Sequence, residues 1–347
     1  MRGPDVIRRP VGGRSAASRC GTFTSSMSSS TPLLIVLLGP TASGKSTLAL
    51  RAAPQIGAEI VNGDSMQMVR HLEIGTAKPS LEERSLVPHH LFDLVEPDEF
   101  FSAGAYMREA RRVCREVAGR GRVPLVVGGT GLYLRVLLEG IFTGPGRSQE
   151  IRDRLDRIVR RRGTSTLHRI LARRDPAAAA SIQPGDRVRV VRALEVVLLT
   201  GLEMSRIQQN RDPLDGFRIL KVGLDVPRSE LYGRIDHRVS RMFAEGLIEE
   251  VQRLLALGYS PSAKAFEALG YRHAAAFLRG EIALENAIDL TQRDTRRYAK
   301  RQLTWFRREK DVRWLHAAGD TPSALDQFMG LLDEVRFSDG VRTGHRS

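Results

Sequence analysis

Hydrophobic positions in the first third of the chain fall into short apolar runs separated by amphipathic stretches. Leu33–Leu38 is a continuous apolar run, which is typical of a strand buried on both faces of a sheet. Similar short runs recur after it, with helical periodicity between them. The predicted strands are Leu33–Leu38, Glu59–Asn62, Leu91–Val95 and Pro124–Val127, with helices from Ser46 and over Ser102–Arg120. This alternation predicts a mostly parallel sheet with helices on both faces.

The pattern changes after about Ile141, where helix signals replace the alternation until about Arg211. The clearest helices there are Glu150–Arg162 and Asp186–Leu199. A strand pattern returns at Phe217–Val226, and long helices follow at about Ser229–Leu255 and Leu284–Arg308. The simplest fold is therefore an α/β core with an inserted all-helical subdomain.

The resulting organisation has five parts. Residues 1–31 carry five Arg, one Asp and many Ser and Gly. A transit peptide has a similar composition, but Met27 is a natural start, so we expect a disordered or misassigned extension. The remaining parts are the first core segment (32–140), the helical insertion (141–215), the second core segment with a basic C-terminal helix (216–318), and a C-terminal helix and tail (319–347).

Composition narrows the function classes. The chain has 54 Lys and Arg residues and 40 Asp and Glu residues, which gives a net charge of +14. This charge favours a polyanionic partner unless it reflects only an Arg-rich genome. Cys20 and Cys114 are too few and too far apart for a disulfide framework or a zinc site, and they fit a reducing cytoplasm. No apolar stretch is long enough to span a bilayer.

A phosphate-binding loop follows the first predicted strand. The residues Gly39, Pro40, Thr41, Ala42, Ser43, Gly44, Lys45 and Ser46 match the pattern G-x-x-x-x-G-K-[ST]. In such a loop backbone amides turn towards phosphate oxygens, the next helix presents its positive end, Lys45 adds charge, and the Ser46 hydroxyl ligates Mg²⁺. A glycine turn that binds nothing is the alternative, and the strand before and helix after the loop argue against it.

The loop does not identify its phosphate compound. Nucleotide hydrolases pair it with a strand ending in an Mg²⁺-binding Asp, whereas the candidate strand here ends in Gly-Gly-Thr130, which disfavours a motor-type ATPase. Asp64, at the end of the second strand, is the best-placed carboxylate. The carboxyl ends of parallel strands should bring the loop, Asp64 and Thr130 together. His89 and His90 lack partners at ligand spacing and are interpreted as structural.

Seven sequence blocks in order carry a family resemblance. They are Gly39–Ser46, Asn62–Gln67 with Glu73–Pro79, Pro88–Asp93, Val127–Tyr133, Arg192–Val196, Leu269–Arg272 and Thr295–Arg307. Together they resemble the bacterial tRNA dimethylallyltransferase (tRNA isopentenyltransferase) family, from about Leu33 to Leu315. Two positions depart from its usual pattern, Val69 in place of Tyr and His273 in place of Glu, which leaves local tRNA contacts open.

The resemblance implies a P-loop, nucleoside-kinase-like α/β core and a tRNA-binding helical insertion. It implies dimethylallyl diphosphate as donor, Mg²⁺ as cofactor, and the exocyclic amine of the adenosine 3′ of the anticodon as acceptor. The loop would then hold a diphosphate, although the family is often labelled ATP-binding. We expect a monomeric, cytoplasmic enzyme that does not associate with membranes.

Two residues are the candidate catalytic groups. Asp64 matches the family's proposed general base, which takes the proton of the attacking amine, and Thr130 would orient the base or the donor. An N-cap role is the alternative for Asp64 and a turn position for Thr130. Arg234 and Arg238, one turn apart, are assigned to the donor diphosphate, with surface solvation as the alternative.

The last group comprises the candidate tRNA contacts. Alkylation requires the adenine to leave its stack. The resemblance implies that Asp64, Ser65, Met66, Gln67 and Thr130 line the extruded base. On the basic helix, Arg293, Arg297 and Arg301 share one face, Ala299, Leu303 and Phe306 form a core stripe, and Tyr298, Gln302 and Trp305 a third. A solvated helix with core aromatics is the alternative. The other contacts are Arg152, Arg189, Arg192, Gly270, Tyr271, Arg272, Lys300, Arg301, Gln302, Trp305 and Arg307.

Two alternative functions must be weighed against this one. A nucleoside or small-molecule kinase would have a similar core, consume ATP and ignore tRNA. A catalytically silent RNA-binding protein would have a decayed loop, which the intact Lys45, Ser46 and Asp64 argue against.

Overall fold

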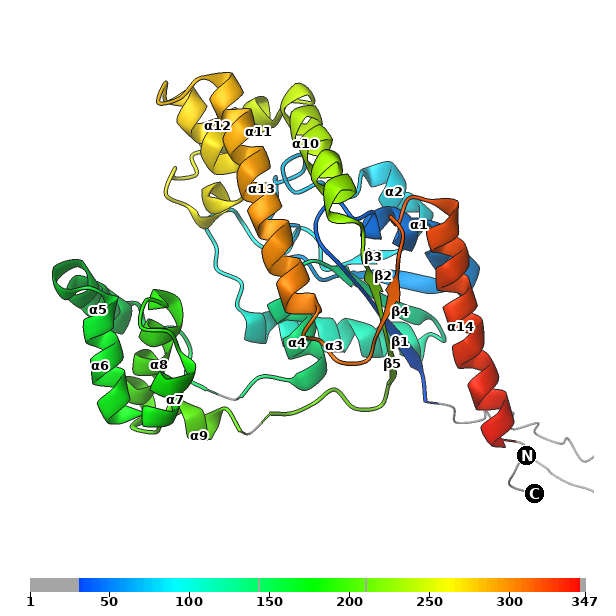
Figure 1. Cartoon of the computed structure of the whole chain (residues 1–347), viewed down its shortest axis with the longest axis horizontal. Helices are drawn as coiled ribbons and strands as arrows, with labels where there is room; N and C mark the ends of the chain where they lie inside the picture. The colour runs from blue at the N-terminus through cyan, green and yellow to red at the C-terminus, as the bar shows by residue number, and fades with distance from the viewer. Residues whose placement is uncertain (1–30, 143, 210, 344–347) are drawn as a thin grey trace, which may run out of the picture. The chain divides into compact units, whose positions relative to one another are not determined.

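The computed structural model describes residues 31–142, 144–209 and 211–343, with side chains to residue 335. The extension predicted for 1–31 lies outside these residues except for Thr31. A six-stranded sheet in the order β3-β2-β4-β1-β5-β6 forms the core, and all its strand pairs are parallel (Figure 1). Its strands are β1 (Leu33–Leu38), β2 (Ala58–Asn62), β3 (His89–His90), β4 (Val123–Gly128), β5 (Arg218–Leu224) and β6 (Val312–Leu315). The predicted α/β class is confirmed.

Helices cover both faces of the sheet because β1 is apolar on both sides. Leu34, Val36 and Leu38 face a core shared with α3 (Ala103–Gly119) and α4 (Gly131–Glu139). Ile35 and Leu37 face the opposite core, which α1 (Lys45–Ile56) and α14 (Pro322–Thr343) complete. The uninterrupted run of apolar residues in β1 therefore encodes a strand between two helical layers.

A second group of helices stands beyond the carboxyl ends of the strands (Figure 1). It comprises α10 (Arg228–Ala244), α11 (Leu247–Ala256), η1 (Lys264–Glu267), α12 (Tyr271–Leu278) and α13 (Leu284–Phe306). Leu231, Ile235 and Val239 of α10 pack with Ala299 of α13 and with Ala42 of the phosphate loop. This packing places α10 and α13 beside the end of the sheet where ligands of such folds bind.

The inserted segment is helical, as predicted. It contains α5 (Gln149–Arg162), α6 (Thr164–Arg174), α7 (Pro176–Ser181), α8 (Arg187–Thr200) and α9 (Met204–Ile207). Leu167, Leu171 and Val190 are fully buried in a core that belongs to this segment alone. A separate apolar core is the mark of a unit that holds its own shape.

Three features differ from the sequence-based prediction. The strand expected at Leu91–Val95 is wrong: Leu91 and Asp93 have positive φ, and β3 is the short His89–His90 instead. The single helix expected over Ser229–Leu255 is interrupted by Gly246 at φ 107, which ends α10 and starts α11. The strand β6 was not predicted. The short helix α2 (Leu81–Leu86) completes the elements.

No helix among the described residues is sufficiently long and apolar to cross a membrane.

Candidate active site

The phosphate loop joins β1 to α1 in a conformation that depends on glycine. Gly44 has φ 88, and a Cβ there would lie 2.7 Å from the amide nitrogen of Gly319. The Gly319 amide in turn donates to the carbonyl oxygen of Ser43 at 2.8 Å. Gly44 is therefore required both by the left-handed turn and by the close approach of a second chain segment. The first amides of α1, which have no intrahelical acceptor, follow directly.

Lys45 lies in the cavity beside this loop. Its Nζ donates to the carbonyl oxygen of Pro40 at 2.7 Å. Burial lowers the pKa of Lys45 to about 7, against the opposing effect of the Asp64 carboxylate, and Arg238 lowers it further. An incoming anion would stabilise the charged form, so this lysine is poised to bind a phosphate group.

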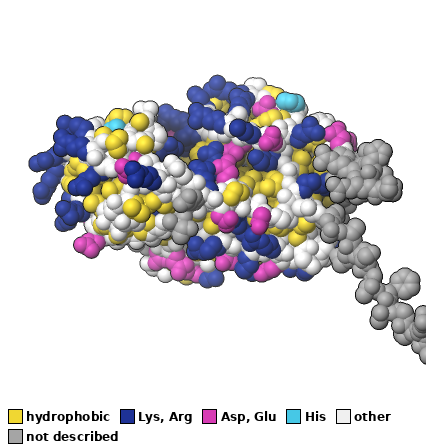
Figure 2. Space-filling model, turned by 90° about the horizontal axis from the view of Figure 1, so that it is seen from below, with side chains coloured by type: hydrophobic (Ala, Val, Ile, Leu, Met, Phe, Trp, Pro, Cys, Tyr) yellow, Lys and Arg dark blue, Asp and Glu magenta, His cyan; other side chains and the backbone are white. Residues whose placement is uncertain are grey.

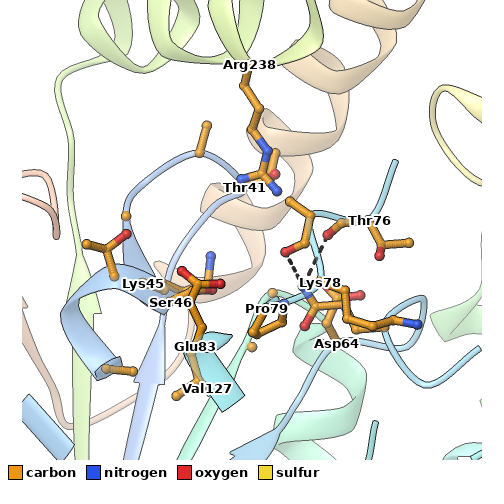
Figure 3. Close-up of a pocket in the computed structure, with 18 of the residues that line it drawn as sticks. Thr41, Lys45, Ser46, Asp64, Thr76, Lys78, Pro79, Glu83, Val127 and Arg238 are labelled. Carbon is orange, nitrogen blue, oxygen red and sulfur yellow. Dashed lines mark hydrogen bonds between the residues drawn. The ribbon is translucent and has the colours of Figure 1, made fainter. Parts of the chain in front are cut away.

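The two arginines assigned to the donor have different places. Arg234 donates from Nε to the carbonyl oxygen of Ala42 at 2.9 Å and pairs with Asp320 at 2.8 Å. It therefore supports the loop from outside and lines neither of the two cavities at the loop, which differs from its predicted role. Arg238 extends from α10 towards Thr41 (Figure 3) and lines both cavities. Among the described residues it has no ion-pair partner within contact distance.

Asp64 is held at the end of β2 by its own turn. The Asp64 amide donates to Oδ1 of Asn62 at 2.8 Å, and Oδ1 of Asp64 accepts from the Met66 amide at 3.0 Å. No helix starts here, so the N-cap alternative is wrong. Thr130 follows β4, and its Oγ1 accepts from the Ser65 amide at 3.1 Å. The structure thus brings the two candidate catalytic residues onto adjoining turns.

Two cavities adjoin at these residues. The first, of about 500 Å³, is lined by the phosphate loop with Lys45 and Ser46, by Gln67, and by the loop from Glu73 to Ser80. The second, of about 570 Å³, is lined by Ser65 and Met66 and by α10, α12 and α13. The residues common to both are Thr41, Ala42, Asp64, Thr76, Arg238, Met242 and Tyr298. A ligand in each cavity would therefore meet its neighbour at Asp64 and Arg238.

Basic side chains surround the second cavity. Arg272, Arg297 and Arg301 line it, and each belongs to an exposed position of α12 or α13. Arg272 and Arg297 both pair with the buried carboxylate of Asp294, which fixes their direction. Lys300 of α13 and Arg307, directly after this helix, are exposed but line a separate, smaller cavity. This surface suits a polyanion outside the second cavity.

Four of the predicted tRNA contacts are turned inwards. Gln302 is only 5% exposed and hydrogen-bonded to the phosphate loop. Trp305 packs in the core cluster of α3 and α4, with the Arg135 guanidinium 4.3 Å from its ring. Tyr271 is fully buried and its hydroxyl bonds to Glu250, while Gly270 is buried at the start of α12. Burial leaves Gln302, Tyr271 and Gly270 little surface for direct contact with tRNA in this conformation, whereas Trp305 is only partly buried.

In the insertion, one candidate tRNA contact is exposed and two are bound to a buried carboxylate. Arg189 is exposed and pairs only with Asp186. Arg152 and Arg192 instead bind the fully buried carboxylate of Glu195, at 2.8 Å and 2.6 Å. Their guanidinium groups remain partly accessible. From Gln149 to Ile207 thirteen arginines stand against seven acidic residues, and Figure 2 shows Lys and Arg gathered over this part of the face in view.

Two functional residues were missed by the sequence reasoning. Tyr298 lines both cavities, as Asp64 and Arg238 do. Its spacing from Gln302 put it on the right stripe, but nothing in the sequence shows which way that stripe faces. Lys78 is fully buried and pairs with Asp93 at 2.6 Å and Glu73 at 2.9 Å, which anchors the loop that lines the first cavity.

A phosphate loop on a parallel sheet, with a carboxylate between two adjoining cavities, defines the protein as a P-loop α/β transferase. The model of the IPP transferase family matches residues 67–309, and the chain belongs to this family. Curated relatives named tRNA dimethylallyltransferase include proteins of Koribacter versatilis, 51% identical over 87% of this chain and 99% of that protein, and Geobacter sulfurreducens, 52% identical over 81% and 91%.

Solved structures agree with this family. The tRNA isopentenylpyrophosphate transferase of Bacillus halodurans is 36% identical with a TM-score of 0.66, over 90% of this chain and 99% of that one. A eukaryotic dimethylallyltransferase described as acting on tRNA is 28% identical with a TM-score of 0.70, over 83% and 74%.

Proposed function

We propose that this protein transfers a dimethylallyl group from dimethylallyl diphosphate to the N6 amine of the adenosine 3′ of the anticodon in tRNA. The observation that carries the proposal is the meeting of two cavities at Asp64, one beside the phosphate loop and one among the arginines of α12 and α13. The names of the relatives support the same reaction. The products would be N6-isopentenyladenosine and diphosphate.

The first cavity provides the chemistry for the donor. The amine nitrogen forms a bond to the allylic carbon while the bond from that carbon to the diphosphate oxygen breaks. Negative charge develops on the departing diphosphate, where the α1 amides, Lys45 and Arg238 lie. Preorganised donors of this kind stabilise a transition state because they need no reorganisation. Asp64 takes the proton that the amine loses, and Thr130 holds the adjoining turn through Ser65.

The residues at the loop also fit Mg²⁺. Ser46 lies exposed at the start of α1 and lines the first cavity. Among the described residues no group of three acidic, His or Cys side chains forms a metal site, and Mg²⁺ commonly takes few protein ligands beside phosphate oxygens and water. We therefore propose that the Ser46 hydroxyl holds the ion. When bound, it supplies positive charge to the diphosphate.

The second cavity provides the acceptor side. An extruded adenine would lie beside Ser65 and Met66, with its amine towards Asp64. Arg272 and Arg301 would contact the flanking phosphates, and Lys300, Arg307 and Arg189 would extend this contact along the RNA. Gln67 lines only the first cavity, with its Nε2 donating to the carbonyl oxygen of Thr76 at 3.1 Å. Its proposed role is thus to shape the loop rather than read the base.

The test is incubation with unmodified tRNA and dimethylallyl diphosphate, followed by nucleoside mass analysis. Addition of one C5 unit to adenosine is expected. ATP-dependent phosphorylation of a small molecule with no prenylated adenosine would overturn the proposal in favour of the kinase alternative. Binding of tRNA without either reaction would favour the silent RNA-binding protein. We also expect the protein to be cytoplasmic and monomeric. Size-exclusion chromatography with light scattering tests the oligomeric state.

A further inference from the structure

The side chain of Gln302 connects two parts of the active site. Its Oε1 accepts from the backbone amide of Thr41 at 2.8 Å, and its Nε2 donates to the carbonyl oxygen of Gly129 at 2.8 Å. Thr41 belongs to the phosphate loop, and Gly129 precedes Thr130. One buried amide group therefore spans the loop that would hold the diphosphate and the turn that supports the catalytic carboxylate.

Gln302 packs closely against Gly129. A Cβ at Gly129 would lie 2.4 Å from Nε2 of Gln302 and 3.7 Å from Oδ2 of Asp64. Gly129 thus lies close to both Gln302 and the candidate base. One helical turn earlier, Tyr298 lines both cavities together with Asp64. The stripe of α13 that faces the site holds the phosphate loop, the Thr130 turn and, through Ser65, the Asp64 turn together.

Other sides of α13 carry exposed charge. Lys300 and Arg301 precede Gln302 in the sequence and are exposed, and Arg301 also lines the second cavity. The same helix therefore presents basic groups to a polyanion on one side and holds the phosphate loop on the other. A contact with tRNA on the exposed side would reach the loop through a single rigid element.

We propose that Gln302 is a positioning residue for the transfer reaction, setting the distance between the diphosphate held by the loop and the base at Asp64. This inference rests on the proposed function. It assigns Gln302 to the internal geometry of the site and takes it off the tRNA-binding surface.

Two variants at this position separate its two hydrogen bonds. Gln302→Met has a similar volume and loses both. Gln302→Glu keeps an acceptor for Thr41 but, when ionised, places a carboxylate oxygen against the Gly129 carbonyl. A protonated Glu would again donate to that carbonyl. Thr304→Ala is the matched control, because Thr304 is exposed on the same helix and bonds only to the backbone of Lys300.

The experiment measures kcat, KM for each substrate, binding of inorganic diphosphate with Mg²⁺, and thermal unfolding. For Gln302→Met we expect kcat to fall by about 10²-fold, since misplacement by about 1 Å has that effect. Diphosphate binding should weaken severalfold, with KM for tRNA within about twofold of wild type. Thr304→Ala should match wild type. For Gln302→Glu, activity relative to wild type should rise as the pH falls.

The outcomes that overturn this inference differ from those that overturn the function. If the wild-type protein prenylates tRNA and Gln302→Met keeps its kcat but raises KM for tRNA, Gln302 is a tRNA contact. If Gln302→Met only lowers the melting temperature, its role is structural. A Gln302→Glu variant whose relative activity does not change with pH contradicts the donor role towards Gly129. Failure of the wild-type reaction itself would reject the proposed function instead.

Discussion

Nε of Arg234 donates to the carbonyl oxygen of Ala42, whereas Arg238, one turn further along α10, lines the cavity without a partner among the described residues. The two arginines thus lie on the same side of the same helix with different surroundings. Arg234 is bound to the protein on both sides of its guanidinium, by Ala42 and by Asp320. Arg238 has unused donors close to where the diphosphate would be.

The first prediction follows from this pair. Arg238→Gln should lower kcat/KM for the donor by about 10²-fold, the usual effect of removing one donor to a developing charge. Arg234→Gln should lower it less than tenfold but reduce stability by about 1–2 kcal/mol, through loss of its charged hydrogen bonds. Steady-state kinetics and urea unfolding of both variants make the comparison. Equal kinetic losses would show that Arg234 also binds the donor.

The sequence revealed the chemistry of this site better than its geometry. The phosphate loop, Asp64 and Thr130 were all identified because strand ends and glycine patterns predict position along a sheet. Helix α13 shows the limit. Periodicity separated the stripe of Tyr298, Gln302 and Trp305 from the exposed arginines, but it could not show that the stripe faces the phosphate loop. That direction depends on packing against residues more than 150 positions away, such as Gly129.

The same limit applies to buried polar contacts. Glu250 belongs to the buried stripe of α11 and accepts from the amide of Ile74 at 2.8 Å. The buried ammonium group of Lys78 pairs with Glu73 of its own loop and with Asp93, 15 residues further along the chain. Neither relationship has a periodic signal. Asp93, which pairs with Lys78, also has a positive φ, within the range Leu91–Val95 that was predicted as a strand.

The second prediction concerns the base. Asp64→Asn preserves the shape of the side chain and an oxygen to accept from the Met66 amide. Turnover should fall by at least about 10²–10⁴-fold, the range for general base catalysis, and Asp64→Ala should abolish it. Affinity for tRNA, measured by filter binding, should stay within about threefold. If Asp64→Asn turned over at a rate near that of wild type, the proton would have to leave by another route.

The third prediction uses the pKa of Lys45, which burial lowers to about 7. At about pH 8 the free protein should hold Lys45 mostly neutral, and diphosphate should bind with uptake of close to one proton at this site. Calorimetry in two buffers of different ionisation enthalpy measures the uptake. Lys45→Met is the control. Subtracting its proton uptake from that of the wild type removes the protons taken up by the ligand itself.

The same shift has a consequence for stability. The folded-state pKa lies below the unfolded value of 10.5, so the unfolded chain binds more protons between about pH 7 and 10.5. Linkage then makes stability of the ligand-free protein rise with pH across this window. In Lys45→Met that contribution should vanish. A wild-type protein and Lys45→Met variant with parallel stability profiles over this range would contradict the lowered pKa.

The fourth prediction concerns Glu195 in the helical insertion. Arg152, Arg192 and the Ser148 amide bind this fully buried carboxylate and, despite the opposing effect of burial, hold its pKa at about 2. Because the folded pKa lies below the unfolded value of 4.5, its contribution to stability is present above about pH 4.5 and is lost as the pH falls towards 2. Acid should therefore loosen this helical segment.

Glu195→Gln tests the network at neutral pH. Two arginines would then face an uncharged amide in a buried place, so stability of α5–α9 should fall by about 3 kcal/mol. Hydrogen exchange followed by mass spectrometry localises the effect, with faster exchange expected in α5 and α8. Glu203→Gln is the control, since its partner Arg206 is 80% exposed and such pairs contribute about 0–1 kcal/mol. Equal protection in Glu195→Gln and wild type would mean that neighbouring apolar packing alone holds α5 against α8.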